Sequence, residues 1–348
     1  MPEISILDPR VLPMVVREYD APTSFMGHQL VMMESDTQPF WEYDIVISER
    51  DKLDTYQTPN SEALLIDQLP VGHMEGRYAY QRVKKQFSPS TTRLLRRVGE
   101  GLASTQAGED KIMEEVEDMR MKMYRAQEFA IWQMIQGSWT YKTDNGGTYS
   151  IDYKIPSDLK VAVSTKWDAA GATVVDDVAA LKRNVVRLSG YPLTTAYMNA
   201  KTMNGFVNSS IVTGYHTNSG TQHFPMLSDQ QTAEYVRERT ISRWMGINWM
   251  EYDDGYVDVD ISDHSTNVNA YKPYIPDGMI IFLTSSSYNP FRFKYGPSID
   301  HEAPPNWTGP FTKSWLEPDP SNRQVLMEVQ YMPMNINPLR IGILTNII

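Results

Sequence analysis

A single long amphipathic pattern over residues 110–136 constrains the fold of this chain more than any other feature. Apolar side chains recur there at steps of three and four residues, the spacing of one face of an α-helix. They are Ile112, Val116, Met119, Met123, Ala126, Ala130 and Met134. At about 1.5 Å per residue the helix would be roughly 40 Å long, well beyond the usual three turns. It therefore has to pack along the length of another element.

Charges give this predicted helix a direction. Acidic residues crowd its start and basic residues follow, which complements the helix dipole. They are Glu109, Asp110, Glu114, Glu115, Glu117 and Asp118, followed by Lys122 and Arg125. Gly137 is the expected C-terminal cap. After Phe129 the pattern is apolar nearly all round, so we expect a buried C-terminal end and an exposed, acidic N-terminal end.

Length and composition narrow the class of protein. The chain has 348 residues, whereas single cores stop growing near about 250–300 residues, so we expect two lobes and segments that leave the main core. Lys and Arg number 32 against 43 Asp and Glu, and the net charge of −11 argues against a general nucleic-acid binder. The sequence has no cysteine, which excludes disulfides, thiol nucleophiles and cysteine-ligated zinc.

The N-terminal stretch, residues 1–37, predicts an extended arm. It has prolines at positions 2, 9, 13 and 22 and sustains neither a helical nor a strand period. Acidic residues stand where a secretory signal needs a basic start, so we expect no signal peptide. The longest strongly apolar runs, such as residues 279–283, fall short of the roughly 18–20 residues that cross a bilayer. We expect a cytosolic protein without membrane contact.

A long hairpin is predicted from residues 43–48 and residues 77–87, with a loop containing Pro59, Pro70, Gly72 and Gly76 between them. Alternation places Tyr78, Tyr80, Arg82 and Lys84 on one face of the return strand and Ala79, Gln81, Val83, Lys85 and Phe87 on the other. Neither face is apolar enough for a core of its own.

Residues 76–99 contain no acid and seven basic residues. These are Arg77, Arg82, Lys84, Lys85, Arg93, Arg96 and Arg97. Two interpretations stay open: a solvated, charged edge that resists strand-to-strand aggregation, or a surface that docks on an acidic face of another subunit.

The rest of the chain predicts a mixed lobe of helices and strands. Helices are expected at residues 176–188, 201–207 and 229–244. Strands are expected at residues 149–163, 194–198, 248–252, 256–261 and 279–283, and two closing strands at residues 325–331 and 339–347. The apolar end of the chain indicates a C-terminus that is part of a sheet.

No motif carries recognisable chemistry. The patterns GxSxG, GxxxxGK[ST] and GxGxxG are absent. Asp258 and Asp260 suggest a calcium loop, but Asp263 and Asn269 stand where a glycine and a bidentate acid are required. The six histidines form neither HExxH nor an i,i+4 pair on a helix, which argues against zinc. We therefore predict no catalytic, cofactor-binding or metal-binding residue, and no enzyme.

Paired carboxylates leave one alternative open. Asp253 with Asp254, or Glu251 with Asp258, could serve a glycosidase, and the eight tryptophans could stack on sugars. Such acids are also common in turns. A carbohydrate-binding module or glycoside hydrolase is therefore kept as an alternative hypothesis.

The order of these elements resembles the HK97-like capsid fold. The resemblance rests on residues 83–97 (VKKQFSPSTTRLLRR), residues 113–136 with the break at Gly137, residues 276–283 (PDGMIIFL) and the strand pair near the end. It covers nearly all of the chain, and none of these stretches is a strict signature. The chain is similar to the major capsid proteins of tailed bacteriophages, in the lambda E-like family.

The resemblance implies an α+β fold with five parts. Residues 1–37 would be the N-terminal arm, and residues 38–100 the extended β-hairpin loop. Residues 101–175 would hold the long spine helix and the first part of the peripheral domain. Residues 176–324 would form the axial domain, and residues 325–348 the closing strands of the peripheral domain.

The resemblance also implies a function. The chain would assemble as pentamers and hexamers into the icosahedral shell of a virion, in the host cytoplasm, around double-stranded DNA that it encloses without sequence-specific binding. Scaffolding, portal and decoration proteins would be its partners, and no lysine crosslink is expected. Another structural virion protein is a second alternative. We predict subunit contacts through Arg77, Arg82, Lys84, Lys85 and Arg93, with Glu114, Glu115, Glu117 and Asp118 of a neighbour as the acidic side.

Overall fold

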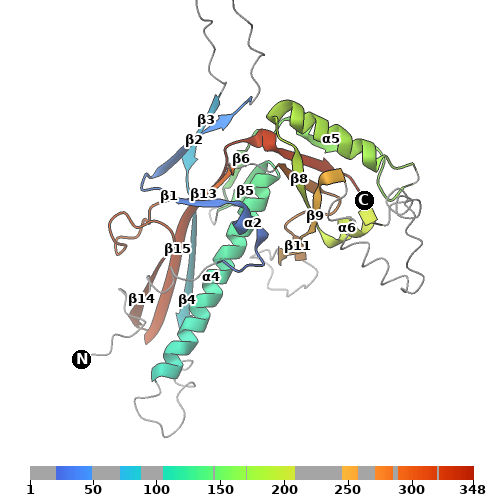
Figure 1. Cartoon of the computed structure of the whole chain (residues 1–348). Coiled ribbons are helices and arrows are strands. Elements are labelled where there is room, and N and C mark those ends of the chain that lie inside the picture. The colour runs from blue at the N-terminus through green and yellow to red at the C-terminus, as the bar shows by residue number, and fades with distance from the viewer. Residues whose placement is uncertain are drawn as a thin grey trace, which may run out of the picture. The chain divides into compact units, whose positions relative to one another are not determined.

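The computed structural model describes residues 21–48, 71–87, 105–143, 146–169, 171–207, 245–257, 271–284, 289–319 and 321–348 (Figure 1). The chain divides into two compact units. Unit 1 comprises Met1–Tyr43, Met74–Ile131 and Phe291–Met334, and unit 2 comprises Asp44–His73, Trp132–Pro290 and Asn335–Ile348. This division confirms the two lobes expected from chain length.

The long helix is present as α4 (Thr105–Ile135). As the apolar period predicted, Val116, Met119 and Met123 are buried, while Glu114 and Glu117 near its start are exposed. In the last turn Trp132, Met134 and Ile135 are buried and Gln133 is half-buried, close to the prediction. Gly137 follows in the left-handed region, at φ 101°, and its N–H donates to the carbonyl of Met134 over 3.0 Å. Glycine adopts that conformation without steric cost and ends the helix there.

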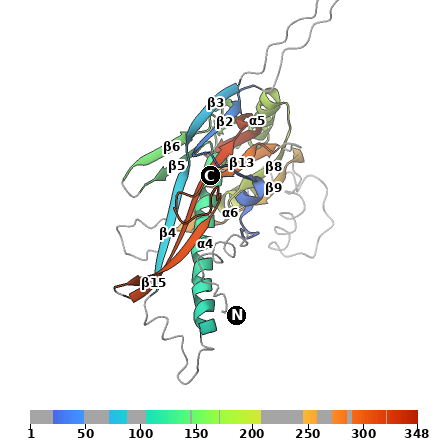
Figure 2. The same cartoon turned by 90° about the vertical axis from the view of Figure 1, so that its left-hand side faces the viewer.

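Unit 1 contains α2 (Met26–Leu30) and a five-stranded sheet. The strand order is β1 (Met32–Ser35), β13 (Phe291–Tyr295), β15 (Ser321–Asn335) and β14 (Phe311–Pro318), and β4 (Ala79–Phe87) also pairs with β15. Val325, Met327 and Val329 of β15 are buried on one face of the sheet. Figure 2 shows α4 running beside β4 and β15. The sheet is thus the element that the length of the helix required.

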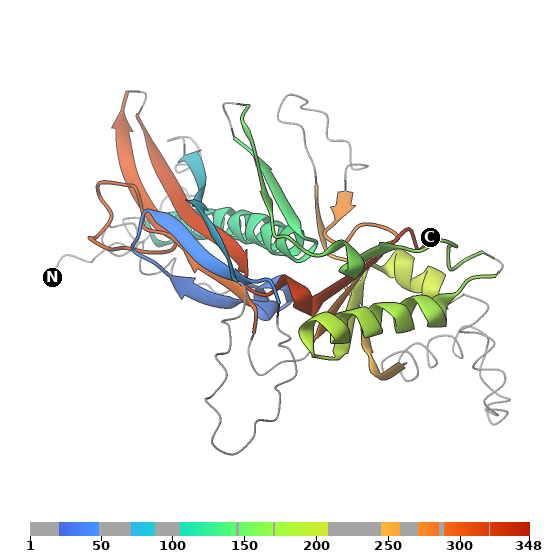
Figure 3. The same ribbon diagram turned by 90° about the horizontal axis from the view of Figure 1, so that it is seen from above.

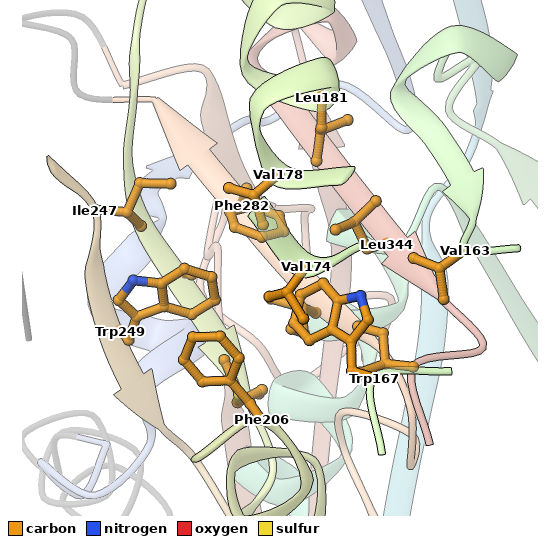
Figure 4. Packing of buried hydrophobic residues seen from close by; sticks show 14 of the residues in the cluster. Val163, Trp167, Val174, Val178, Leu181, Phe206, Ile247, Trp249, Phe282 and Leu344 are labelled. Atoms are coloured by element: carbon orange, nitrogen blue, oxygen red, sulfur yellow. The ribbon is translucent and has the colours of Figure 1, made fainter. Parts of the chain in front are cut away.

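Unit 2 contains a second five-stranded sheet with order β7 (Lys160–Ala162), β16 (Ile341–Thr345), β12 (Ile280–Thr284), β8 (Leu193–Met198) and β9 (Asn248–Glu251). Helix α5 (Val174–Ser189) lies along it (Figure 3), and α6 (Ala200–Val207) joins the same core. Figure 4 shows Phe282 and Leu344 of the sheet packed with Val178 and Leu181 of α5. The helices predicted at residues 176–188 and 201–207 are confirmed.

Both faces of this sheet are covered. Phe282 faces α5, whereas its neighbour Ile281 pairs with Tyr197, whose ring lies 5.6 Å from that of Trp132 at the end of α4. A strand buried on both faces has a continuous apolar run, not an alternating one. That is why IIFL in β12 and IGIL in β16 were recognisable as strands.

The predicted long hairpin is wrong in its second strand. Instead, β2 (Phe40–Val46) pairs with β3 (Val71–Arg77) as a two-stranded ribbon. Residues 79–87 form β4, which pairs antiparallel with β15 and places Val83 opposite Met327. Alternation along a strand determines which face a residue occupies, but not which strand lies beside it.

The closing strands are also grouped differently from the sequence-based scheme. β15 belongs to the sheet of unit 1, together with β13 and β14, whereas β16 belongs to the sheet of unit 2. The sequence-based prediction had placed β13 and β14 in the axial domain, residues 176–324. The short 3₁₀ helix η5 (Pro338–Arg340) separates β15 from β16. The names peripheral and axial, and their boundaries, stay predictions.

The strand predicted at residues 149–163 is interrupted. β6 (Thr148–Asp152) pairs with β5 (Ser138–Lys142), and η2 (Ser157–Leu159) precedes β7. Lys154 has a φ of 57°, and its N–H donates to Asp152 Oδ1 over 3.0 Å, so the chain turns there. A last ribbon joins β10 (Gly255–Val257) and β11 (Tyr271–Pro273). The helix predicted at residues 229–244 and most of the strand at residues 256–261 lie outside the described residues.

Candidate assembly surface

Strand β4 places its basic residues on two faces, as alternation predicted. Arg82 and Lys84 are exposed on the outer face of the sheet, opposite Glu328 and Leu326 of β15. Lys85 points to the other side, where α4 runs. The outward pair is therefore available to another molecule, whereas Lys85 has an acidic helix of its own chain beside it.

Lys85 pairs within its own chain. Its Nζ bonds Glu115 Oε2 and lies 3.8 Å from Asp118 Oδ2. Lys122 reaches Asp118 over 2.8 Å, and the hydrogen bond from Lys122 holds the pKa of Asp118 below its usual value. These partly exposed pairs contribute about 0.2–1 kcal/mol each. The predicted complementarity between the basic strand and the helix start thus exists, for Lys85 and Glu115, inside one subunit.

A buried carboxylate organises the outer face beside Arg82. Glu328 is 2% exposed and accepts hydrogen bonds from the hydroxyls of Tyr80 and Ser298, each over 2.5 Å. The N–H of Asp300 lies 3.3 Å from the same carboxylate. Glu328 thereby fixes the segment that follows β13 on top of β4 and β15.

The same segment also carries a largely buried ion pair. Lys313 of β14 donates to Asp300 Oδ2 over 2.6 Å. Burial alone would raise the pKa of Asp300, but the hydrogen bonds from Lys313 and from the N–H of Glu302 hold it below its usual value. The exposed charges of the outer face therefore lie over buried polar groups that are held in place by hydrogen bonds.

Replacing Tyr80 with phenylalanine is expected to lower the free energy of unfolding by about 1 kcal/mol, because Glu328 loses a donor. Burial and the bond to Glu328 raise the pKa of Tyr80. Because the folded-state pKa is the higher one, the protonated Tyr80 hydroxyl stabilises the folded state. This stabilisation is complete below the unfolded-state pKa of about 10 and is lost as the pH rises above it. Urea midpoints measured from about pH 7 to about pH 11 should decline less steeply in Tyr80→Phe. Equal slopes in the two proteins would contradict this assignment.

The β2–β3 ribbon presents apolar side chains to solvent. Phe40 and Val71 are each more than half exposed, and so is Ile47, which directly follows β2. The guanidinium of Arg77 lies 5.6 Å from the Phe40 ring, and the Arg77 carbonyl accepts a bond of 2.8 Å from Trp41 Nε1. Two-stranded ribbons are marginally stable alone, and exposed apolar groups mark contact surfaces. The ribbon is therefore suited to contact with a further surface.

The remaining predicted interface residues are accounted for as follows. Glu114 and Glu117 are exposed on α4, and Arg93 lies outside the described residues. The structure brings Lys85 together with Glu115 and Asp118, and it pairs neither Lys84 nor Arg77 with those acids within the described ranges.

Sequence reasoning missed a buried polar cluster on α4. Glu128 is fully buried and accepts bonds from the N–H groups of Gly27 and His28 and from His28 Nδ1. The signal was an acid and an amide, Gln127-Glu128, directly before the stretch where the helix is apolar nearly all round. Such a residue needs a partner inside the protein.

Neither a metal centre nor a membrane-spanning helix is found in the described part of the chain. Within the described ranges, His, Asp and Glu side chains form no group of three or more that could hold a metal ion. In the same ranges, every helix is too short or too polar to span a bilayer.

Comparison with known proteins agrees with the fold. The family model for phage major capsid protein E matches residues 15–345. A solved protein described as a prophage capsid protein from Escherichia coli CFT073 is 14% identical over 97% of this chain and 99% of its own, with a TM-score of 0.60. A phage-related protein from Bordetella bronchiseptica RB50 is 10% identical over 99% of both chains, with a TM-score of 0.56. No curated protein sequence matches.

The structural likeness shows the HK97-like fold, as the resemblance implied. The family match gives no support to a carbohydrate-binding module or glycoside hydrolase. Because the match spans nearly the whole sequence, the chain belongs to the phage major capsid protein E family, whose members are structural proteins of the capsid.

Proposed function

We propose that this chain assembles as pentamers and hexamers into a closed shell around packaged double-stranded DNA, and that the outer face of β4 is one of its subunit contacts. The proposed subunit contact rests on the way that β4 places its basic residues on two opposite faces. Lys85 is already paired with Glu115 of its own helix, whereas Arg82 and Lys84 are exposed on the opposite face. Charges presented outward from a rigid sheet are suited to an acidic partner surface.

The acidic side of this contact is the exposed face of α4 near its start, on a neighbouring copy. Glu114 and Glu117 are exposed there, and Arg77 extends the basic side along β3. Arg93 belongs to the proposed set from its place in the basic stretch. Weak contacts of this type suffice, because symmetry repeats each one around a closed assembly.

Further partners follow from the same proposal. Scaffolding and portal proteins are proposed to assist assembly in the host cytoplasm, and a decoration protein is an additional candidate. The net charge of −11 suits a container that encloses DNA without adhering to it.

Reversing the outward charges tests the contact. The variant Arg82→Glu with Lys84→Glu is expected to lose assembly, because both charges would then repel the acidic face. The matched control is Lys166→Glu with Arg183→Glu, which makes the same charge change at exposed positions of unit 2. Circular dichroism measures the fold, and light scattering measures particle formation.

A charge swap makes the test specific. Adding Glu114→Lys and Glu117→Lys to the reversed variant should restore particles, because complementarity returns with opposite signs. Particles from the first variant at the wild-type yield, or equal loss in the matched control, would show that this face is not a subunit contact.

A further inference from the structure

Strand β14 lies at an edge of the sheet in unit 1. In the described part of the chain it pairs with β15 alone, and β4 pairs with the opposite side of β15 (Figure 1). The register of β14 against β15 runs from Phe311 to Pro318 without a bulge. An edge strand presents backbone N–H and C=O groups that can pair with a further strand. β14 therefore offers a straight edge, with a proline only at its last position.

Three side chains of β14 form a row on the outer face of the sheet, with opposite charges at its two ends. Lys313 Nζ lies 5.8 Å from the centroid of the Trp315 ring, and Trp315 Nε1 donates to Glu317 Oε2 over 3.2 Å. Glu317 also accepts a bond of 3.2 Å from the neutral amide of Gln324. The ammonium of Lys313 donates to Asp300 over 2.6 Å and has further N–H donors. Because the opposite charges stand at equal distances from the tryptophan, the row is complementary to its own copy after half a turn about Trp315.

We propose that β14 pairs antiparallel with β14 of a second copy, across a two-fold axis that passes through Trp315 perpendicular to the sheet. Each Lys313 then lies opposite Glu317 of the partner subunit, and the two Trp315 side chains lie opposite each other. On the other face of the strand, Leu316, which is 66% exposed, lies opposite Ser314 of the partner subunit and is shielded from water. Opposite charges and aromatic pairs in such cross-strand positions are favourable.

The same operation is unfavourable at the edge formed by β4. Half a turn about Val83, at the middle of that strand, would place Arg82 opposite Lys84 of the partner subunit. Like charges directly opposite each other destabilise an antiparallel pair. The charges of β4 therefore prevent it from pairing with its own copy, whereas those of β14 favour such pairing.

The two contacts differ in symmetry. The contact proposed between β4 and α4 joins unlike surfaces, so it closes rings, whereas pairing of β14 joins like surfaces, so it links one ring to another. A closed shell requires both kinds of contact. The inference rests on the proposed function only in that several copies assemble, and it uses a different surface of the chain.

Cysteine trapping tests the pairing, because the chain contains no cysteine of its own. Residues directly opposite each other in an antiparallel pair have Cα atoms about 4.5–5.5 Å apart, which a disulfide can bridge. Trp315→Cys is therefore expected to migrate mainly as a covalent dimer on a non-reducing gel after oxidation with diamide. Leu316→Cys is the matched control. Position 316 faces its own copy only diagonally, at about 7–8 Å, and should crosslink about fivefold less.

Charge reversal tests the register. Glu317→Lys in the Trp315→Cys background places like charges opposite each other and is expected to lower the dimer fraction about fivefold. Asp319→Lys makes the same charge change outside the row and should leave the dimer fraction unchanged. Trp315→Cys combined with Arg82→Glu and Lys84→Glu should still give dimers, so that failure of the contact at β4 is distinguished from failure of the pairing at β14.

Several outcomes would overturn the proposal. They are a monomer from Trp315→Cys, equal crosslinking at positions 315 and 316, crosslinking at position 316 alone, and equal losses in Glu317→Lys and Asp319→Lys. If Trp315→Cys fails to fold, Ser314→Cys combined with Leu316→Cys decides in its place, because these two positions lie opposite each other in the proposed register. A covalent dimer from that variant supports the pairing, and a monomer contradicts it.

Discussion

Glu128→Ala is expected to lower the free energy of unfolding by about 3–5 kcal/mol, because three buried donors lose their acceptor and each unpaired buried donor costs about 1–3 kcal/mol. Glu128 is fully buried, and its loss would leave His28 and two backbone N–H groups without their acceptor. Replacing the residue would therefore also detach α2 from α4. Urea denaturation measures the loss, and hydrogen exchange of residues 25–31 locates it.

The matched control is Glu117→Ala, which removes an exposed acid from the same helix. Surface changes of that kind usually stay within about 0.5 kcal/mol. Equal unfolding midpoints for the two variants would show that the arm is not held by Glu128.

Phe282→Ala is the second large effect, with an expected loss of about 3–5 kcal/mol in unit 2. Phe282 is fully buried at the centre of the core in Figure 4, with its ring 5.5 Å from that of Trp249 and edge-on to it. Gly342 lies opposite it in β16, so the adjacent strand has no side chain that could fill the space. The loss should appear as faster hydrogen exchange in β8 and β12.

Val175→Ala is the control for this change, because Val175 lies on α5 but is 40% exposed. Truncating it creates no enclosed cavity, so the loss should be a small fraction of that for Phe282→Ala. Similar losses in the two variants would contradict the assignment of the core.

The helices and strands that were predicted well are those in which the spacing of apolar residues within the element itself indicates its type and its buried face. In α4, Val116, Met119 and Met123 repeat at helical spacing, and burial on one face follows from that spacing alone. The runs IIFL and IGIL identify strands buried on both faces. Boundaries were close because residues such as Gly137 and Gly190 end helices in the left-handed conformation.

Strand partners could not be predicted in the same way. Alternation correctly put Lys84 and Lys85 on opposite faces of residues 79–87, but it contains nothing about β15 as the neighbour. The closing strands were expected together because they are adjacent in sequence, yet η5 redirects the chain between them. Pairing is decided by tertiary packing, which a local pattern does not record.

For the candidate assembly surface, too, the sequence showed which residues are charged but not which of them pair. The basic stretch and the acidic helix start were visible as charge runs, but whether they meet within one chain or between chains depends on the strand pairing. For Lys85 and Glu115 they meet within one chain. Glu128 was missed because the burial of a helical acid is recognisable only once its partners, far away in sequence, are known.

Electron microscopy of the purified chain is expected to show closed shells, or rings of five and six copies, in which Arg82 and Lys84 of one copy lie against the acidic face of α4 in the next. A monodisperse single chain at high concentration, or shells in which both side chains stay in solvent, would contradict it.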